Sequence, residues 1–419
     1  MASPCAQPQL PHFTAWLRES GAHLSPKLEF FCSAAGRGIR AVEPLDAGEV
    51  AASVPLKLLV TTDRALADEE LRASTLRGTN LMALFLLRQR APGQPWYPYV
   101  DALPRTLGTP IFWSNELRAE LQSTELASLT RAREAAVAKH YDALSANFLA
   151  ASSLDDFKWA LSIVWSRGHT VDIPGGDGQG ALIPLIDMFN HHLEPAVRAG
   201  SVEGEAFVLR VGRRLERGHE ATVPYGAHGP LPNSRLLMEY GFCERSNSAE
   251  DYLTLHLNAS RAIAPHEDPH RWLRAGALSQ LALSPQENFA VRIGLQATTL
   301  PPIALAFARL STLKEKQVLE EAIGVASADP QLRSHWLSRL VRGALEDEAS
   351  LRFLAEALRW KLRNYTTSAE HDELLLHRKV FSGEEMECAL LVRLAEKRAI
   401  GRWLSETQAS VSGLQHEEL

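Results

Sequence analysis

Three short segments of the chain combine ligand-binding side chains with backbone that can turn sharply. The first covers residues 35–41, where Gly36 and Gly38 flank Arg37. Glycines at this spacing allow a tight turn and leave amides and carbonyls open to a ligand. The pair lacks the third glycine and following helix of a dinucleotide fingerprint, so taken alone it is equally typical of a hairpin turn.

The second segment covers residues 183–192, an apolar run that ends in Asn190 and His191. An Asn side chain offers a donor and an acceptor together, which suits the edge of a purine. Asp187, His191 and His192 are alternative metal ligands, but no further ligand stands at a convincing spacing. A polar turn that caps a strand is the third interpretation.

The third segment covers residues 221–226 and 233–242 and contributes Tyr225, Tyr240 and Phe242. Aromatic side chains at strand ends can line an apolar channel with a hydroxyl inside it, although Tyr in a strand more often only packs. Each segment is ambiguous by itself. Packing alone does not explain all three in this order.

The elements that position these segments follow from hydrophobic periodicity and turn residues. Residues 25–62 alternate short apolar runs with turns and predict a meander of short strands, and further strands are expected at 181–188, 206–211, 221–225 and 252–257. Helical spacing between these groups predicts a helical insertion at about 63–168. Helical periods after residue 258 predict a separate all-α domain over 259–419, leaving 1–258 as the first domain.

Composition excludes several classes of protein. The 419 residues contain 45% hydrophobic and 22% charged residues, as in ordinary folded proteins. A net charge of -6 gives no overall basic field, so we expect no direct nucleic-acid binding. No apolar stretch reaches the roughly 20 residues that cross a bilayer, and no membrane association is expected. The four scattered cysteines predict reduced thiols and an intracellular protein, with cytoplasm, nucleus and chloroplast undistinguished.

Taken together, the motifs resemble the SET-domain methyltransferases, specifically the subgroup of the Rubisco large-subunit lysine methyltransferase (LSMT). The resemblance rests on residues 36–39 with 45–49, on 187–191, on Tyr225-Gly226 and on 239–242. It implies an α+β fold with short-strand sheets and a knot-like core, a helical insertion and an all-α C-terminal domain. That C-terminal domain would be the Rubisco LSMT-type substrate-binding domain. The chain is expected to be a monomer.

The resemblance also assigns roles to residues. S-adenosylmethionine would be held by Gly36, Arg37, Gly38, Arg167, Asn190, His191, Tyr225 and Phe242. The backbone around Arg37 would contact this cofactor, and Arg167 would bind its carboxylate by a charge-assisted hydrogen bond. Tyr225 matches the catalytic tyrosine, and Tyr240 would form a second wall of the lysine channel. No metal is expected.

The expected activity is transfer of a methyl group to a lysine of a protein substrate, with a non-histone protein favoured. A free lysine, with a pKa of about 10.4, must first lose its proton, and an apolar channel beside a sulfonium favours the neutral form. Ala35, where relatives often carry an acidic residue, and the long loop 227–232 depart from the family pattern.

Three alternatives remain open at this point. A protein-histidine methyltransferase is the first, although its relatives tend to lose the second tyrosine and Tyr240 is present here. A non-catalytic SET-fold module that binds peptides is the second, disfavoured by the retained Tyr225, Asn190, His191 and Arg167. A scaffold built on the C-terminal helices is the third.

Overall fold

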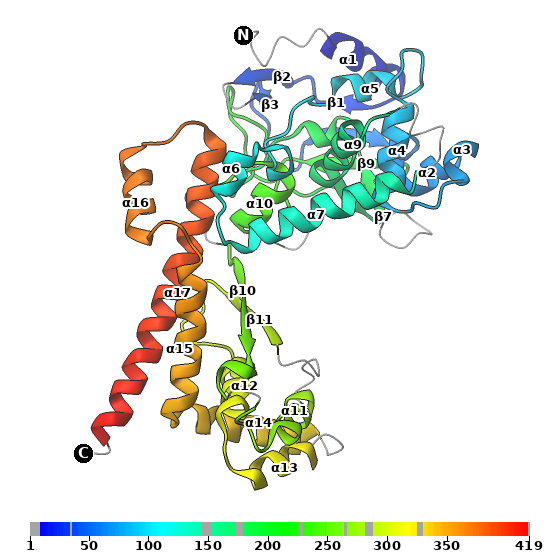
Figure 1. The fold of residues 1–419 in the computed structure, drawn as a ribbon. Coiled ribbons are helices and arrows are strands. Elements are labelled where there is room, and N and C mark those ends of the chain that lie inside the picture. The colour runs from blue at the N-terminus through cyan, green and yellow to red at the C-terminus, as the bar shows by residue number, and fades with distance from the viewer. Residues whose placement is uncertain are drawn as a thin grey trace. The chain divides into compact units, whose positions relative to one another are not determined.

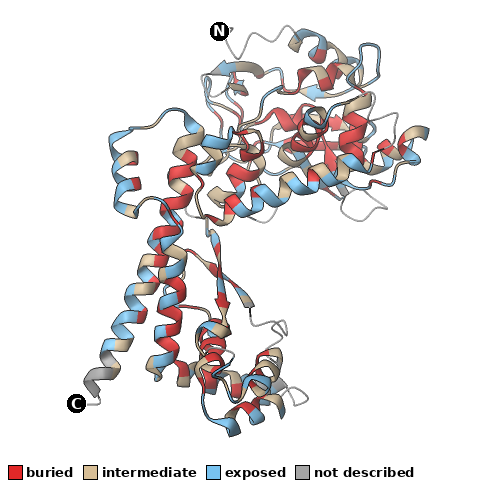
Figure 2. Ribbon diagram, viewed as in Figure 1, coloured by how far each residue is buried: buried red, intermediate tan, exposed pale blue. Residues whose placement is uncertain are grey.

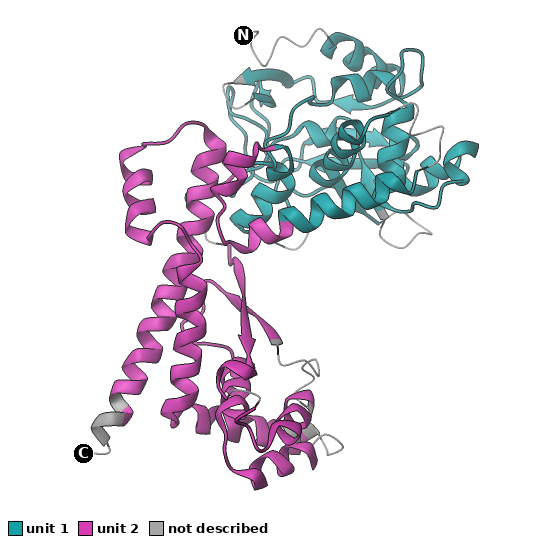
Figure 3. Ribbon diagram, in the orientation of Figure 1, with its two compact units in different colours: residues 1–112, 130–242 teal, residues 113–129, 243–419 magenta. Residues whose placement is uncertain are grey.

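The computed structural model describes residues 9–33, 36–144, 152–172, 179–226, 229–247, 249–263, 266–280, 288–324 and 330–417, and Figure 1 shows their fold. Contacts divide the chain into two compact units, coloured separately in Figure 3. Unit 1 comprises Met1–Phe112 and Thr130–Phe242, and unit 2 comprises Trp113–Leu129 and Cys243–Leu419. Each unit buries its own hydrophobic cluster, and Figure 2 shows buried residues inside both.

Unit 1 contains three small antiparallel sheets among its described residues. The largest has the strand order β1-β4-β9-β8, the second pairs β2 with β3, and the third has the order β5-β7-β6. The strands are β1 (His23–Leu24), β2 (Leu28–Ser33), β3 (Gly36–Ala41), β4 (Val50–Pro55), β5 (Val60–Thr61), β6 (Gly168–Val171), β7 (Gln179–Leu182), β8 (Ser201–Glu203) and β9 (Ala206–Arg210). Since most strands are short, side-chain packing around them must hold the functional loops in place.

Helices that lie mainly between β5 and β6 in the sequence supply this packing. They are α2 (Thr62–Leu66), α3 (Glu69–Arg72), α4 (Thr79–Arg88), α5 (Tyr97–Ala102), α9 (Leu154–Arg167) and the part of α7 (Glu125–Asp142) from Thr130 onward. Two further helices of unit 1 lie outside the insertion, α1 (Leu10–Glu19) and α10 (Asn233–Tyr240). Unit 1 also contains the short 3-10 turns η1 (Leu56–Leu58), η2 (Pro110–Phe112) and η3 (Ile186–Met188). A capping box between Ser153 and Asp156 starts α9, whose last residue is Arg167. The helical insertion thereby delivers one predicted site residue.

Unit 2 is mostly helical. Its elements are α6 (Asn115–Ala119), the start of α7, β10 (Tyr252–Asn258), η4 (Ala259–Arg261), α11 (Arg271–Gln280), β11 (Asn288–Gly294), α12 (Pro302–Thr312), α13 (Lys316–Gly324), α14 (Pro330–Leu345), α15 (Glu348–Arg363), α16 (Ala369–Arg378) and α17 (Glu384–Glu417). Strands β10 and β11 form an antiparallel pair. Leu253, Leu255 and Leu257 alternate along β10 into the hydrophobic cluster of this unit.

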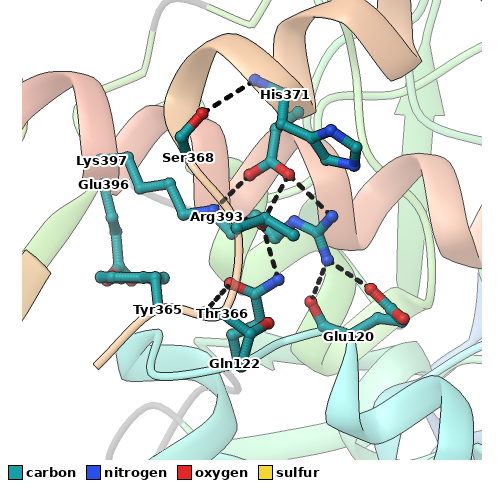
Figure 4. A network of polar contacts seen from close by, with 11 residues as sticks. Glu120, Gln122, Tyr365, Thr366, Ser368, His371, Arg393, Glu396 and Lys397 are labelled. Atoms are coloured by element: carbon teal, nitrogen blue, oxygen red, sulfur yellow. Dashed lines mark hydrogen bonds and ion pairs between the residues drawn. The ribbon is translucent and has the colours of Figure 1, made fainter. Parts of the chain in front are cut away.

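A buried charge cluster, of which Glu120 alone is partly exposed, binds the segment between α6 and α7 to the C-terminal helices; it consists of Glu120, Asp372, Arg393, Glu396 and Lys397. Figure 4 labels Glu120, Arg393, Glu396 and Lys397. Asp372 accepts from Arg393 at 2.8 Å and from Lys397 at 2.5 Å, and Arg393 also binds the Glu120 carboxylate at 2.5 Å. Burial opposes ionisation of Asp372, but these donors outweigh it and hold its pKa below the usual value. Residues 113–129 are therefore part of unit 2, although they lie inside the predicted insertion.

The structure differs from the sequence prediction at several places. Residues 221–225 form only an isolated bridge at Val223, and the strand expected at 181–188 ends at Leu182, before Pro184. The C-terminal region is helical as predicted but also contains β11. The contact boundary falls between residues 242 and 243, whereas the predicted domain limit lies after 258.

The cysteines and the membrane prediction give two further results. The prediction of reduced thiols is wrong for Cys32, which is disulfide-bonded, whereas Cys243 and Cys388 are thiols outside any disulfide. Among the described residues, every helix is too short or too polar to cross a membrane. Ala35 and residues 227–228 lie outside the described residues.

Candidate active site

The Asn190 side chain joins the first two sequence motifs. Its Nδ2 donates to the Arg37 main-chain oxygen at 2.9 Å and to Glu220 Oε1 at 2.7 Å. Gly38 permits this approach, because a Cβ there would lie 2.2 Å from Glu220 Oε1 and 2.9 Å from Asn190 Nδ2. Position 38 therefore has no room for a larger residue unless its neighbours move. Gly36 begins the same strand, with a φ of +115°.

A buried carboxylate, that of Asp187, lies three residues before this asparagine in the sequence. Asp187, on η3, accepts a hydrogen bond from the Tyr99 hydroxyl at 2.6 Å through Oδ2. Burial raises the pKa of Asp187, although Arg167, Tyr99 and Arg37 act to lower it. Among the described residues, Asp187 Oδ1 has no hydrogen-bond partner.

Two guanidinium groups face that carboxylate. Arg167 donates through Nη1 to the Asp187 main-chain oxygen, and Arg37 donates to the Ala102 oxygen at 3.0 Å and to Met188 Sδ at 2.7 Å. Burial and the neighbouring Arg167 lower the pKa of Arg37 to about 10, so it remains charged near neutral pH. Arg167 Nε is buried without a hydrogen-bond partner among the described residues. Two cations against one carboxylate leave a surplus positive charge, which suits a carboxylate-bearing ligand.

Four rings form an aromatic cluster beside these groups: His191, Tyr225, Tyr240 and Phe242. The centroids of Tyr225 and Tyr240 are 4.5 Å apart, those of His191 and Tyr225 are 5.1 Å apart, and that of Phe242 lies 6.0 to 6.4 Å from the other three. His191 Nδ1 accepts from the Tyr225 amide at 3.0 Å, which assigns the ring proton of neutral His191 to Nε2. This hydrogen bond ties the His191 ring to the Tyr225 backbone.

The Tyr225 hydroxyl donates to the Phe189 main-chain oxygen at 3.1 Å. Burial raises the pKa of Tyr225 to about 12 and also raises that of Tyr240. Both phenols therefore stay protonated at neutral pH. A neutral hydroxyl beside a main-chain carbonyl can orient a small polar group by hydrogen bonds.

Helix α10 places Tyr240 and Phe242. It ends at Tyr240, and Gly241 adopts the left-handed conformation with a φ of +85°. A Cβ on Gly241 would lie 2.6 Å from the Gly108 backbone, so only glycine fits. On the other side Arg133 of α7 donates to the Met238 oxygen at 3.0 Å and stacks on Trp165. The turn from Tyr240 to Phe242 is therefore fixed by contacts within unit 1.

The structure brings the predicted residues together in unit 1: Gly36, Arg37, Gly38, Arg167, Asn190, His191, Tyr225, Tyr240 and Phe242. The alternative metal site is disfavoured by geometry, because Asp187 Oδ2 and His191 Nδ1 already bind Tyr99 and the Tyr225 amide. Among the described residues, no group of three His, Cys, Asp or Glu side chains could hold a metal ion.

Sequence reasoning missed two residues, Tyr99 and Glu220. Tyr99 lies in the helical insertion, at 0% exposure, and nothing in its local sequence separates it from a core tyrosine. Glu220 is in an isolated bridge opposite Arg40 and looks like an exposed turn residue in the sequence. Both are recognised only from their partners, Asp187 and Asn190.

Comparison with known proteins agrees with this architecture. The family model described as Rubisco LSMT substrate-binding matches residues 265–400. A solved structure described as Rubisco LSMT bound to AdoMet superposes with a TM-score of 0.78 at 22% identity, covering 98% of this chain and 93% of that one. A second, the SET domain of LSMT bound to lysine and AdoHcy, gives a TM-score of 0.77 at 21% identity, with coverage of 98% and 93%.

Curated relatives are protein methyltransferases of two kinds. The tobacco (Nicotiana tabacum) ribulose-1,5 bisphosphate carboxylase/oxygenase large subunit N-methyltransferase is 26% identical over 87% of this chain and 74% of its own length. The Arabidopsis thaliana [fructose-bisphosphate aldolase]-lysine N-methyltransferase is 25% identical over 93% of this chain and 81% of its own. The mouse (Mus musculus) actin-histidine N-methyltransferase is 26% identical over 93% and 67%. These comparisons confirm the predicted fold and the predicted resemblance.

Proposed function

Because the chain has the fold and motifs of the SET-domain methyltransferases of the Rubisco LSMT-like subgroup, we propose that it is an S-adenosylmethionine-dependent protein-lysine N-methyltransferase. The observation that carries the proposal is the placement of the aromatic cluster beside Asn190 and the two arginines. The cofactor would supply a sulfonium-bound methyl group: an uncharged amine would bond to the methyl carbon in line as the neutral thioether leaves, and the positive charge would pass to the methylated nitrogen.

The donors and charges of the site fit this cofactor. The buried Arg167 Nε without a partner and the surplus positive charge at Arg37 and Arg167 suit its carboxylate. Asn190 and His191 would hold the adenosyl part, with Phe242 against the adenine face. The Arg37 backbone, next to Gly36 and Gly38, would complete the cradle.

The aromatic cluster would act on the lysine. The pKa of a lysine side chain, about 10.4 in water, falls in apolar surroundings because desolvation disfavours the ammonium form. The Tyr225 hydroxyl keeps its proton and donates a hydrogen bond to the Phe189 oxygen, so its lone pairs are available to an amine N–H. Tyr225 would thus orient the nitrogen lone pair, with Tyr240 as the second wall, and catalysis would come from positioning.

The substrate is proposed to be a protein, since residues 265–400 match the Rubisco LSMT substrate-binding family. One observation favours a second candidate, a histidine acceptor, because the mouse relative is an actin-histidine N-methyltransferase. The retained Tyr240 favours lysine. The reason is that, in the SET-domain family that the chain resembles, the histidine-modifying members tend to lose the second tyrosine.

Calorimetric titration with S-adenosylhomocysteine tests the cofactor site. We expect binding by the full chain and at least tenfold weaker binding by Asn190→Ala, because this change removes donors to Arg37 O and Glu220. Asn115→Ala, on the exposed face of α6, is the control and should bind like the wild type. A folded wild-type protein without affinity would refute the proposal and favour the peptide-binding module.

The acceptor residue is identified by incubating a cell lysate with the protein and methyl-labelled cofactor, followed by peptide mass spectrometry. Label on lysine side chains supports the proposal, and label on histidine alone replaces it with the second candidate. Tyr225→Phe serves as the control for background methylation.

A further inference from the structure

Besides Arg167, the helical insertion contributes the polar side chain of Tyr99 to the site. This residue belongs to α5, is 0% exposed, and donates its hydroxyl to Asp187 Oδ2 at 2.6 Å. Asp187 is itself only 6% exposed. A buried hydrogen bond from a hydroxyl to an ionised carboxylate is among the strong ones in proteins.

Asp187 belongs to the turn that carries the cofactor-binding motif. Its amide donates to the Ile183 oxygen at 3.1 Å, and its main-chain oxygen accepts from Arg167. The preceding Leu185 has a φ of +78°, a conformation that costs a non-glycine residue energy and that its surroundings must hold. Asn190 follows shortly after η3, so the shape of this turn decides where the Asn190 amide lies.

The groups that face Asp187 come from four other parts of unit 1. They are Tyr99 of α5, Arg37 of β3, Arg167 of α9 and, in the aromatic cluster, Tyr225. Among the described residues, Asp187 Oδ1 has no hydrogen-bond partner, and Oδ2 accepts from the Tyr99 hydroxyl. The bond from Tyr99 is therefore the side-chain hydrogen bond that this carboxylate accepts. Loss of the Tyr99 hydroxyl would therefore leave a buried carboxylate with no side-chain donor there.

We propose that Tyr99 is a positioning residue, which fixes Asp187 and through it holds η3 so that Asn190 and Arg167 face the cofactor. This inference rests on the proposed function. This role explains why α5 places the polar side chain of Tyr99 inside an otherwise apolar cluster, where the ring centroid of Phe13 lies 6.2 Å from that of Tyr99.

Tyr99→Phe tests the inference, because it keeps the ring and its packing but removes the donor. We expect affinity for S-adenosylhomocysteine to fall about tenfold by calorimetry and the melting temperature to fall by a few degrees, because the buried Asp187 carboxylate loses its donor. Tyr97→Phe, on the same helix, changes a tyrosine whose ring lies 6.2 Å from His12, and should bind like the wild type. Unchanged affinity of Tyr99→Phe, or an equal loss in Tyr97→Phe, overturns the inference.

A double-mutant cycle separates positioning from a general structural effect. If Tyr99 acts through η3 and Asn190, the double variant Tyr99→Phe with Asn190→Ala should bind nearly as well as Asn190→Ala alone. The further loss of affinity should be about twofold or less. Full multiplication of the two losses would show independent action and contradict the proposal. Should wild-type protein bind no S-adenosylhomocysteine, the proposed function fails and takes this inference with it.

The pH dependence of affinity provides a second readout, one that loss of packing would not move. Loss of the hydroxyl raises the pKa of Asp187 further, because the ionised form loses its donor. Any inflection that Asp187 causes in the affinity profile should therefore move to higher pH in Tyr99→Phe and vanish in Asp187→Asn. Asp187→Asn keeps an acceptor for Tyr99, so it also tests the pair if Tyr99→Phe does not fold. An inflection that is lost in Asp187→Asn but lies at the same pH in Tyr99→Phe as in the wild type would overturn the inference.

Discussion

The rings of Tyr225 and Tyr240 lie 4.5 Å apart between centroids, with their planes inclined by 32°. Tyr225 follows the isolated bridge at Val223, whereas Tyr240 ends α10. Within the described ranges, the hydroxyl of Tyr225, and not that of Tyr240, donates to a main-chain oxygen, that of Phe189. The two tyrosines therefore share an aromatic wall but differ in polar contacts, which predicts different roles.

Tyr225→Phe should lower the turnover number by roughly 100-fold, because the amine loses the hydroxyl that orients it. Affinity for S-adenosylhomocysteine should stay within about twofold, since the ring remains against His191. Single-turnover methylation and calorimetry measure the two quantities. Tyr252→Phe, at an exposed position of β10, is the matched control. Equal losses in turnover and cofactor affinity would count against the assigned role.

Gly241→Ala should destabilise unit 1 by about 3 kcal/mol, because the new methyl group adds a clash to backbone strain. The Cβ would lie 2.6 Å from the Gly108 backbone at a φ of +85°. Gly218→Ala is the control, with almost the same φ, +84°, and nothing within 4 Å of its Cβ. It should cost about 1 kcal/mol. Urea unfolding of the full chain measures both, and equal effects would remove the steric part of the explanation.

Asp372→Asn should destabilise unit 2 by about 3 to 5 kcal/mol, because Arg393 and Lys397 would lose their shared buried counterion. The exposed pair between Glu203 and Arg210 provides the comparison, and Glu203→Gln should have no measurable effect. Urea unfolding of each variant gives the free energies. A wild-type curve for Asp372→Asn would show that the buried charge cluster contributes little to stability.

Glu396 should make unit 2 less stable as the pH rises. Burial raises its pKa to about 7, against hydrogen bonds from Tyr365 and the Glu125 amide and the charge of Lys361. Since the folded pKa lies above the unfolded value of 4.5, this group favours folding fully below about pH 4.5 and loses that contribution as the pH rises to about 7. The difference corresponds to at most about 3 kcal/mol.

Hydrogen exchange at the Glu125 amide, which donates to Glu396 Oε1 at 2.9 Å, measures this effect locally. Protection, corrected for the intrinsic pH dependence of exchange, should fall between about pH 5 and about pH 7.5 in the wild type. Glu396→Gln keeps an acceptor without a charge, so its protection should not change over that interval. The same decline in Glu396→Gln would assign the pH dependence to another group.

Several features of the fold were predictable because they depend on local patterns. Helix α9 was expected from its periodicity at residues 155–166, and it spans Leu154–Arg167. Strand β11 was missed, although Phe289, Val291 and Ile293 alternate, because its neighbours in the sequence are helical. Residues 221–225 were wrongly predicted as a strand, since their apolar side chains are buried by loop packing and not by a ladder.

Short sequence motifs were enough to identify which residue types stand at the site and in what order. Asn190, His191, Tyr225, Tyr240 and Phe242 were selected from short motifs, and these motifs are local because each follows one turn of the backbone. The sequence also identified Arg167 by the resemblance. In the structure these side chains are in one compact unit.

The distant groups that complete that site depend instead on how the unit packs in three dimensions. Tyr99 reaches Asp187, Glu220 reaches Asn190, and Gly241 meets Gly108 across segments that no local pattern connects. Residues 113–129 likewise join unit 2 through the buried charge cluster. The physical reason is that a buried hydrogen bond, ion pair or backbone contact depends on distances set by the packing of the whole unit, whereas propensity and periodicity act over a few neighbouring residues.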